Sequence, residues 1–223
     1  MDRILITGAL GQLGIEFIDH FKKLNSFVLA TDIKNPKEKL SCEFELANVL
    51  DKDKMDSLVK KYNINVIYHL VAVLSANGEK DPFISWKLNM NSFQNIAQIS
   101  IENKIKKIFW PSSIAIFGTE SNLNFVSQNP LMNPTTIYGI TKLAGEKLME
   151  YYFNKFGLDI RSLRYPGIIS TKTVPGGGTT DYVIEMLNAA KKGNDYVCFL
   201  SENTELPMMY IDDAINSAVK LMS

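Results

Sequence analysis

Short apolar segments and amphipathic stretches of helical length alternate along the whole of this 223-residue chain. The apolar segments lack a regular polar/apolar alternation, which is typical of strands buried on both faces of a parallel sheet. They lie at residues 3–7, 27–31, 66–73, 105–110 and 160–165. The stretches with helical periodicity lie at about 12–23, 52–62, 83–103, 136–156, 181–192 and 212–222. This order predicts an α/β fold with a doubly wound, Rossmann-type parallel sheet.

Three glycines follow the first expected strand, at the point where the first helix opens. Gly8, Gly11 and Gly14 form the spacing G-x-x-G-x-x-G, close to the G-x-G-x-x-G of dinucleotide-binding loops. Gly8 would permit a sharp turn, Gly11 would let the backbone approach a pyrophosphate, and Gly14 would let helix and strand pack closely. The amino terminus of the helix would then attract the phosphates. A plain turn is the alternative, but the flanking strand and helix favour a dinucleotide site.

An acidic residue closes the second expected strand. Asp32 lies 24 residues after Gly8, where a carboxylate would hydrogen-bond the ribose hydroxyls of the adenosine half of the cofactor. The same carboxylate would repel a 2′-phosphate, so NAD is expected in preference to NADP. Lys34 lies close enough to Asp32 to weaken this preference for NAD. It is more simply explained as a solvated charge in the loop. Taken alone, Asp32 is equally well explained as a polar strand end.

Two Tyr-x-x-x-Lys pairs occur, Tyr138/Lys142 and Tyr151/Lys155, although chance alone predicts roughly one in a chain of this composition. Both pairs have the i, i+4 spacing that places two side chains on one helix face. Tyr138 begins its helix soon after a strand and the loop that contains Ser113, near the carboxyl edge of the sheet. Tyr151 lies about 20 Å further along the helix at ~1.5 Å per residue. The position therefore favours Tyr138.

These side chains suit the oxidation of an alcohol by hydride transfer. Tyr138 would accept the hydroxyl proton, and Ser113 would position the reacting oxygen. A phenol with a pKa near 10 is a weak base at pH 7, so its pKa must be lowered by nearby positive charge. Lys142 and the nicotinamide cation are the expected sources of that charge.

The overall composition excludes several classes of partner. Lys and Arg together number 24, as do Asp and Glu, so the formal net charge is zero and predicts neither a nucleic acid nor an anionic membrane as partner. Cys42 and Cys198 form no disulfide framework, and the histidines His20 and His69 are isolated, so no metal site is expected. The apolar segments are too short to span a membrane and no leader precedes residue 3, which together predict a cytoplasmic protein.

The helices expected at 83–103 and 136–156 carry more apolar surface than one sheet contact requires. In the first, a stripe that includes Phe83, Trp86 and Met90 is accompanied by further apolar residues off that stripe, and the second helix has the same character. Burial inside a larger monomer would explain this surface. A homodimer in which both helices pair with their copies is the favoured interpretation.

Longer segments carry a resemblance to a known family. They are SANGEK at 75–80, WPSS at 110–113, YGITK at 138–142, RSLRYPG at 161–167, GGTTDY at 177–182 and LPMMY at 206–210. The chain resembles the short-chain-type L-threonine 3-dehydrogenases, a branch of the extended short-chain dehydrogenase/reductase superfamily (the NAD-dependent epimerases/dehydratases). The resemblance runs from Ile4 to the last expected helix. It implies oxidation of L-threonine to L-2-amino-3-oxobutanoate with NAD, or the same oxidation of a related hydroxy amino acid to its own keto product.

The resemblance also implies a set of site residues. The catalytic residues would be Tyr138, Lys142 and Ser113, and the substrate would contact Ser75, Ser113, Tyr138, Thr179 and Thr180. The cofactor would contact Gly8, Gly11, Gln12, Leu13, Gly14, Asp32, Asn48, Val49, Leu70, Val71, Ala72, Asn89, Tyr138, Lys142, Tyr165 and Pro166. Residues 1–168 would form the NAD-binding domain. Residues 169–223 would form part of a substrate-binding annex, including the Gly/Pro/Thr-rich loop at 170–180.

The sequence departs from the family in three respects. Asn48 replaces an Asp expected beside the adenine, although its carbonyl can still accept a hydrogen bond. Val71 replaces a smaller Ala in a strand that passes the cofactor. The chain stops at Ser223, before the elements that complete the substrate cap in the family. Two alternatives therefore stay open: a nucleotide-sugar epimerase or dehydratase, and a truncated NAD-binding module without turnover.

Overall fold

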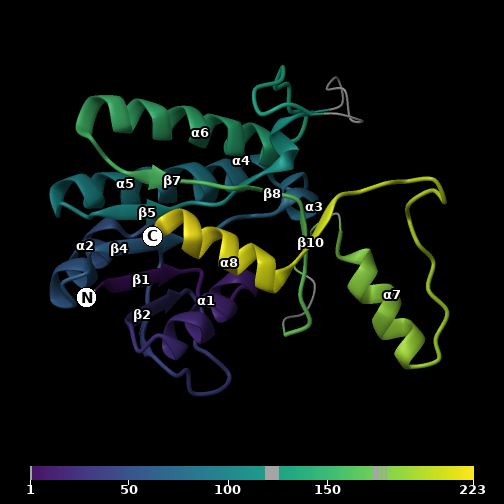
Figure 1. Ribbon diagram of the computed structural model, residues 1–223, viewed down its shortest axis with the longest axis horizontal. Helices are drawn as coiled ribbons and strands as arrows, with labels where there is room; N and C mark the ends of the chain where they lie inside the picture. The colour runs from purple at the N-terminus through teal and green to yellow at the C-terminus, as the bar shows by residue number, and fades with distance from the viewer. Residues whose placement is uncertain (1, 119–125, 173–175, 177, 179) are drawn as a thin grey trace.

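The computed structural model describes residues 2–118, 126–172, 176, 178 and 180–223. Its centre is a six-stranded sheet in the order β3-β2-β1-β4-β5-β7, in which every pair of neighbouring strands is parallel (Figure 1). The strands are β1 (Arg3–Thr7), β2 (Phe27–Asp32), β3 (Glu43–Leu46), β4 (Val66–His69), β5 (Lys107–Phe109) and β7 (Ile160–Arg161). The strand order reverses between β1 and β4, where doubly wound folds bind ligands. The expected α/β class and Rossmann-type sheet are confirmed.

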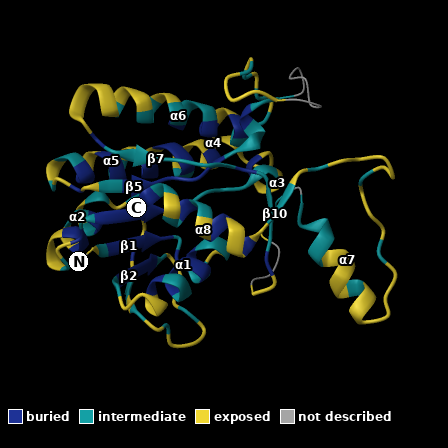
Figure 2. Ribbon diagram, viewed as in Figure 1, coloured by how far each residue is buried: buried dark blue, intermediate teal, exposed yellow. Residues whose placement is uncertain are grey.

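Helices cover both faces of the sheet. They are α1 (Gln12–Lys23), α2 (Lys52–Lys61), α5 (Ser92–Glu102), α6 (Ile137–Phe156) and α8 (Ile211–Met222). α1 and α8 contact each other over one apolar cluster, which includes Phe17 and Tyr68. α2 and α5 contact each other over the second cluster, which includes Leu5 and Ile67, and α6 packs beside α5. Figure 2 shows the central strands as the most deeply buried part of the molecule.

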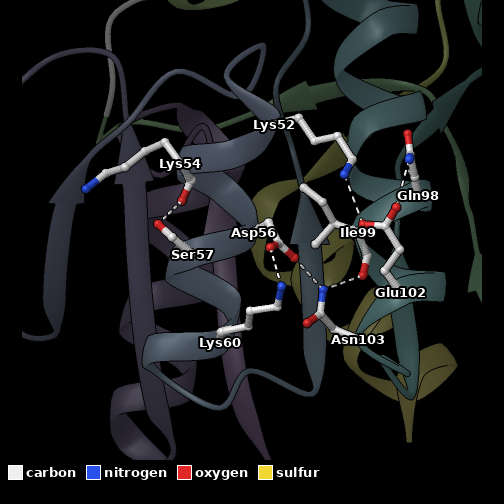
Figure 3. A network of polar contacts seen from close by, with 9 residues as sticks. All are labelled: Lys52, Lys54, Asp56, Ser57, Lys60, Gln98, Ile99, Glu102 and Asn103. Atoms are coloured by element: carbon white, nitrogen blue, oxygen red, sulfur yellow. Dashed lines mark hydrogen bonds and ion pairs between the residues drawn. The ribbon is translucent and has the colours of Figure 1, made fainter.

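The outer contact between α2 and α5 is polar, as Figure 3 shows. Lys52 Nζ lies 2.9 Å from Glu102 Oε2, and Asn103 donates to Asp56 across a distance of 2.7 Å. Asp56 also pairs with Lys60 at 2.6 Å on the same helix. Exposed pairs of this kind contribute little stability individually. The two helices are held together mainly by the apolar cluster beneath them.

Shorter elements surround the carboxyl edge of the sheet. They are α3 (Ser75–Gly78), α4 (Pro82–Trp86), a π-turn η1 (Lys87–Asn91), β6 (Ser112–Ser113), a 3-10 turn η2 (Ile114–Ile116), β8 (Arg164–Tyr165), β9 (Gly167–Ile169), α7 (Tyr182–Lys191) and β10 (Met208–Tyr210). β6 pairs with β8, and β9 pairs with β10, as two small parallel sheets. α7 stands away from the main sheet in Figure 1 and has no fully buried residue.

The long elements lie within one or two residues of their expected positions, but three expected strands are shorter. The strand expected at 105–110 covers only Lys107–Phe109. The strand expected at 66–73 ends at His69, and beyond it the backbone of Val73 bonds to the side chain of Asn89 and not to a neighbouring strand. The strand expected at 160–165 divides into β7 and β8, which join different sheets.

Two further differences concern a helix and an edge strand. The helix expected at 83–103 is interrupted by η1, where the pattern alone indicates a continuous helix. β3 was not expected, because its sequence EFEL alternates polar and apolar residues and is not one of the continuous apolar runs from which the strands were predicted.

Among the described residues, no helix combines the length and apolar character that crossing a membrane requires. No group of three or more potential metal-binding side chains was found in those residues either.

Candidate active site

The glycine loop joins β1 to α1 at the switch point of the sheet. Gly8 has φ +67°, a left-handed conformation that glycine adopts without strain, and its carbonyl accepts a hydrogen bond from Gly11 N at 3.1 Å. A Cβ on Gly14 would lie 2.5 Å from the carbonyl oxygen of Ala9, so only glycine fits against the strand there. Gly11 is the N-cap residue of α1, so no capping side chain bonds to the first N–H groups of the helix. The first turn of α1 also contains no acidic residue. Its amino terminus is therefore suited to an anion.

The acidic residue at the end of β2 is held beside this loop. One carboxylate oxygen of Asp32 accepts a hydrogen bond from Leu10 N at 3.1 Å, and the other accepts one from Lys34 N at 3.3 Å. The side-chain oxygen of Asn48 accepts a hydrogen bond from Leu50 N, and the side chain of Val49 is buried in the core. Asp32 thus lies next to the glycine loop, whereas Asn48 and Val49 stabilise their own turn.

Two adjoining clefts open along the carboxyl edge of the sheet. The cofactor-side cleft has a volume of about 520 Å³ and is lined by the glycine loop, Leu70, Ala72 and Ser170. The substrate-side cleft has a volume of about 550 Å³ and is lined by Ser113, Tyr138 and Lys142. The two clefts share Gln12, Leu13, Leu70, Ala72, Leu74 and Asp181. An elongated ligand could therefore span both.

Ser113, Tyr138 and Lys142 reach the substrate-side cleft from two elements. Ser113 ends β6, whereas Tyr138 and Lys142 lie one turn apart on α6. Thr136 caps α6 by accepting a hydrogen bond from Gly139 N at 3.1 Å, which fixes where the helix begins. Lys142 is 2% exposed, and its Nζ donates to the Pro111 carbonyl at 2.7 Å and lies 4.2 Å from the centre of the Trp110 ring. The structure therefore places the expected trio in one cleft.

The electrostatics differ from the expectation that Lys142 lowers the pKa of Tyr138. Burial raises the pKa of Tyr138, and a hydrogen bond with Ser113 opposes that rise only in part. Burial also lowers the pKa of Lys142 to about 7. The Lys142 amine is held by Pro111 and Trp110, so the contacts seen here do not make Tyr138 a stronger base. A base at this position would need further positive charge beside the phenol.

The sequence analysis missed a charged cluster directly behind this trio. Both carboxylate oxygens of Glu146 accept hydrogen bonds from Arg164, with distances of 2.9 Å to Nε and 2.8 Å to Nη2. Ser112 donates to the same carboxylate at 2.6 Å. Arg164 also donates to the carbonyl of Gln128 at 2.6 Å. The cluster therefore ties α6 to β8 and to Ser112 of β6, the residue directly before Ser113.

A second buried network connects the sheet to the π-turn. His69 lies between the hydroxyls of Thr7 and Ser92, at 2.7 and 3.0 Å, and burial lowers its pKa to about 3, so it is neutral. Asn89 accepts from Val73 N at 2.7 Å and donates to Thr141 at 3.2 Å. A π-turn often marks a functional site. Here it brings Asn89 between the loop after β4 and α6, although Asn89 lines neither cleft.

The remaining expected residues fall into three groups. Those that line a cleft are Gly8, Gly11, Gly14, Gln12, Leu13, Leu70, Ala72, Ser75, Tyr165, Pro166 and Thr180. Val71 lines neither cleft and packs against Gly8, where its Cγ2 would lie 3.1 Å from an added Cβ. The hydroxyl of Tyr165 donates to the buried carbonyl of Ala214 at 2.7 Å, so its polar end is directed into the core. Thr179 lies outside the described residues.

The parallel sheet, the glycine loop and the Ser-Tyr-Lys cleft are the features of a dinucleotide-dependent oxidoreductase. A family model described as the NAD dependent epimerase/dehydratase family matches residues 4–223. The chain belongs to this family, so its cofactor is a nicotinamide dinucleotide.

Individual proteins extend the comparison. An uncharacterised epimerase/dehydratase from Staphylococcus saprophyticus is 42% identical over 227 residues, a match that spans 100% of this chain and 71% of the relative. A GalE-like L-threonine dehydrogenase from Cupriavidus necator, solved in its holo form, is 41% identical with a TM-score of 0.95 over 99% of this chain and 72% of that one. A monomeric L-threonine 3-dehydrogenase from a metagenome is 42% identical with a TM-score of 0.94 over 99% and 71%. The chain is thus similar in sequence and fold to dehydrogenases.

Proposed function

We propose that this chain oxidises the 3-hydroxyl of L-threonine to L-2-amino-3-oxobutanoate, with NAD as the hydride acceptor. The observation that carries the proposal is that Ser113, Tyr138 and Lys142 line one cleft that adjoins the cleft of the glycine loop. The similarity to L-threonine dehydrogenases at 41–42% identity supports the choice of substrate. A related hydroxy amino acid is the alternative substrate within the same chemistry.

In this mechanism, Tyr138 removes the proton of the substrate hydroxyl and Ser113 holds the same oxygen by a hydrogen bond. A bound nicotinamide dinucleotide would supply the hydride acceptor and a positively charged ring. That charge would favour the phenolate of Tyr138, whose pKa burial otherwise raises. Lys142 would hold the nicotinamide ribose, exchanging its bond to Pro111 for one to a hydroxyl. Ser75, Thr179 and Thr180 would contact the amino and carboxylate groups of the substrate.

The preference for NAD over NADP follows from Asp32. Its carboxylate is fixed by the backbone N–H groups of Leu10 and Lys34, so it cannot easily turn away from a ligand at the end of β2. An added 2′-phosphate would meet this negative charge. The structure therefore supports NAD as the cofactor that the chain uses.

Turnover is tested by the appearance of NADH absorbance when the protein is mixed with NAD and L-threonine. Tyr138→Phe is expected to reduce kcat by at least about a hundredfold, the lower end of what general-base catalysis supplies. NADH binding, measured by fluorescence, should be largely retained. Tyr151→Phe is the matched control, because it removes the tyrosine of the other Tyr-x-x-x-Lys pair on the same helix, and should leave kcat unchanged.

Other outcomes would contradict the proposal. NADH binding without turnover of L-threonine or related hydroxy amino acids would indicate a binding module. Thermal stabilisation by UDP-glucose, but not by L-threonine, would indicate a nucleotide-sugar enzyme. Equal activity in Tyr138→Phe and the wild-type protein would exclude Tyr138 as the base.

A further inference from the structure

A short segment that begins within β9 lies along the first helix of the cofactor site. We call residues 168–172 the strap. At one end, Gln12 Nε2 donates to the carbonyl of Ile168 at 3.2 Å. At the other end, Lys172 Nζ lies 2.7 Å from both Glu16 Oε2 and Asp19 Oδ2. Because the three partners on α1 are spaced i, i+4 and i+7, they share one helix face. The strap is therefore attached to α1 at both of its ends.

Lys172 contacts two carboxylates at once, one of them on a buried residue. Hydrogen bonds to the two carboxylates raise its pKa well above the usual range, so it stays protonated. Glu16 is only 8% exposed, which limits the screening of this pair by solvent. The pair between Lys172 and Asp19 is partly screened by solvent, because their side chains are 48% and 43% exposed.

Ser170 lies in the middle of the strap and lines the cofactor-side cleft together with Gly8, Gly11 and Gly14. The residue is 1% exposed, and its hydroxyl has no hydrogen-bond partner within the described part of the chain. A buried hydroxyl without a partner costs free energy. This hydroxyl is therefore available to a ligand in the cleft that also includes the amino terminus of α1, and that helix end is suited to an anion.

We propose that Ser170 is a further cofactor-binding residue, whose hydroxyl donates a hydrogen bond to the pyrophosphate of the dinucleotide. Lys172 is a positioning residue that holds the strap, and with it Ser170, on α1. The ligand chemistry is that of a dinucleotide diphosphate, since the same cleft includes the glycine loop. This inference rests on the cofactor part of the proposed function and is independent of which alcohol is oxidised.

The test compares ligands that share the adenosine and differ in the phosphates. In Ser170→Ala, the Kd for NADH (by fluorescence) and for ADP-ribose (by calorimetry) should both rise about tenfold or more, the loss expected for a hydrogen bond to a charged group. The affinity for adenosine, measured by displacement of NADH, should not change. Ser170→Thr keeps a hydroxyl and should recover most of the binding. Ser57→Ala, on the exposed surface of α2, is the matched control.

The positioning role of Lys172 is tested by the rate at which NADH dissociates. Lys172→Met is expected to raise the dissociation rate constant of NADH about tenfold by stopped-flow fluorescence, whereas Lys172→Arg keeps the pairs and should stay near the wild-type rate. An unchanged rate in Lys172→Met would overturn this positioning role. Thermal unfolding of each variant shows whether it is folded. Should Ser170→Ala be unfolded, Ser170→Gly and Ser170→Thr provide the same comparison.

The results separate this inference from the proposed function. If the wild-type protein binds ADP-ribose and Ser170→Ala binds it equally well, the role of Ser170 is wrong and the cofactor assignment stands. An equal loss of affinity for adenosine and ADP-ribose would also overturn a contact with the pyrophosphate. If the wild-type protein binds neither NADH nor ADP-ribose, the cofactor assignment and the role of Ser170 both fail.

Discussion

At the scale of single residues, the burial of Lys142 in the candidate site lowers the stability of the fold while the residue is charged. Its amine is buried against the ring of Trp110 and donates a hydrogen bond to the Pro111 carbonyl. Burial without a carboxylate partner disfavours the charged form, and the pKa falls from 10.5 to about 7. The folded chain therefore binds fewer protons at this residue than the unfolded chain does between about pH 7 and 10.5.

This difference predicts a pH dependence of stability. Because the unfolded chain binds more protons in that window, the contribution of Lys142 to the free energy of unfolding rises as the pH increases from about 7 to 10.5. Lys142→Met removes that contribution. It should unfold at higher urea concentration than the wild type at pH 7, with a difference that narrows toward pH 9.5. Each unit of pKa shift corresponds to about 1.36 kcal/mol. Parallel pH profiles for the two proteins would show that Lys142 is not perturbed.

The residue types of the site were predictable, but their interactions were not. Gly8, Tyr138 and Lys142 stand in local patterns whose spacing can be read from the chain. Glu146 and Arg164 are separated by 18 residues in no recognisable pattern, and their pairing depends on the packing of α6 against β8. The unpartnered hydroxyl of Ser170 likewise becomes apparent only once the strap lies on α1.

At the scale of elements, the position of α6 depends on Gly145, which lies inside the helix and not in a turn. A Cβ added to Gly145 would overlap the ring of Trp110, so the helix can lie this close to the ring only without a side chain at that position. Helix propensity alone would favour alanine by about 1 kcal/mol. The close contact brings α6, with Tyr138 and Lys142, up to the strand end that presents Pro111.

We expect Gly145→Ala to lower stability by about 1–3 kcal/mol, because the cost of overpacking exceeds the gain in helix propensity. The measurement is the urea unfolding midpoint at constant m-value. In a Trp110→Leu background, where the ring is absent, the same substitution should cost much less. A stabilising effect of Gly145→Ala in the wild-type background would show that α6 is not held at this distance by Trp110.

At the scale of the whole molecule, the exposed apolar surface of α4 and α6 supports the proposal of a homodimer. The two helices contact each other, and the exposed large side chains on them are Phe83, Ile84, Trp86, Ile140, Tyr151, Phe153 and Phe156. Phe83 is 86% exposed and Phe153 is 61% exposed, which is unusual for large apolar side chains in such number. Figure 2 shows much of the outer surface of α6 as exposed. A second copy of this chain would cover that surface.

Sedimentation equilibrium tests the dimer. The wild-type protein is expected at twice its 25.1 kDa chain mass, and Phe83→Ser combined with Phe153→Ser should shift it toward the monomer. Phe199→Ser is the matched control, because Phe199 is 66% exposed but lies outside α4 and α6. A wild-type protein that sediments at the mass of one chain would contradict the proposal of a dimer. A monomer is a realistic outcome, because the similar L-threonine 3-dehydrogenase from a metagenome is monomeric.

The α/β class, the parallel sheet and the location of the glycine loop and of the Ser-Tyr-Lys residues can be read from the amino-acid sequence alone. These features follow from local periodicity and from spacing along the chain, which neighbouring residues encode directly. The end of β4 at His69, the interruption of the helix expected at 83–103 by η1, and the contacts of Glu146, Arg164 and the strap around the site emerge only from the folded structure. Those features depend on contacts between residues far apart in sequence, for which no local pattern exists.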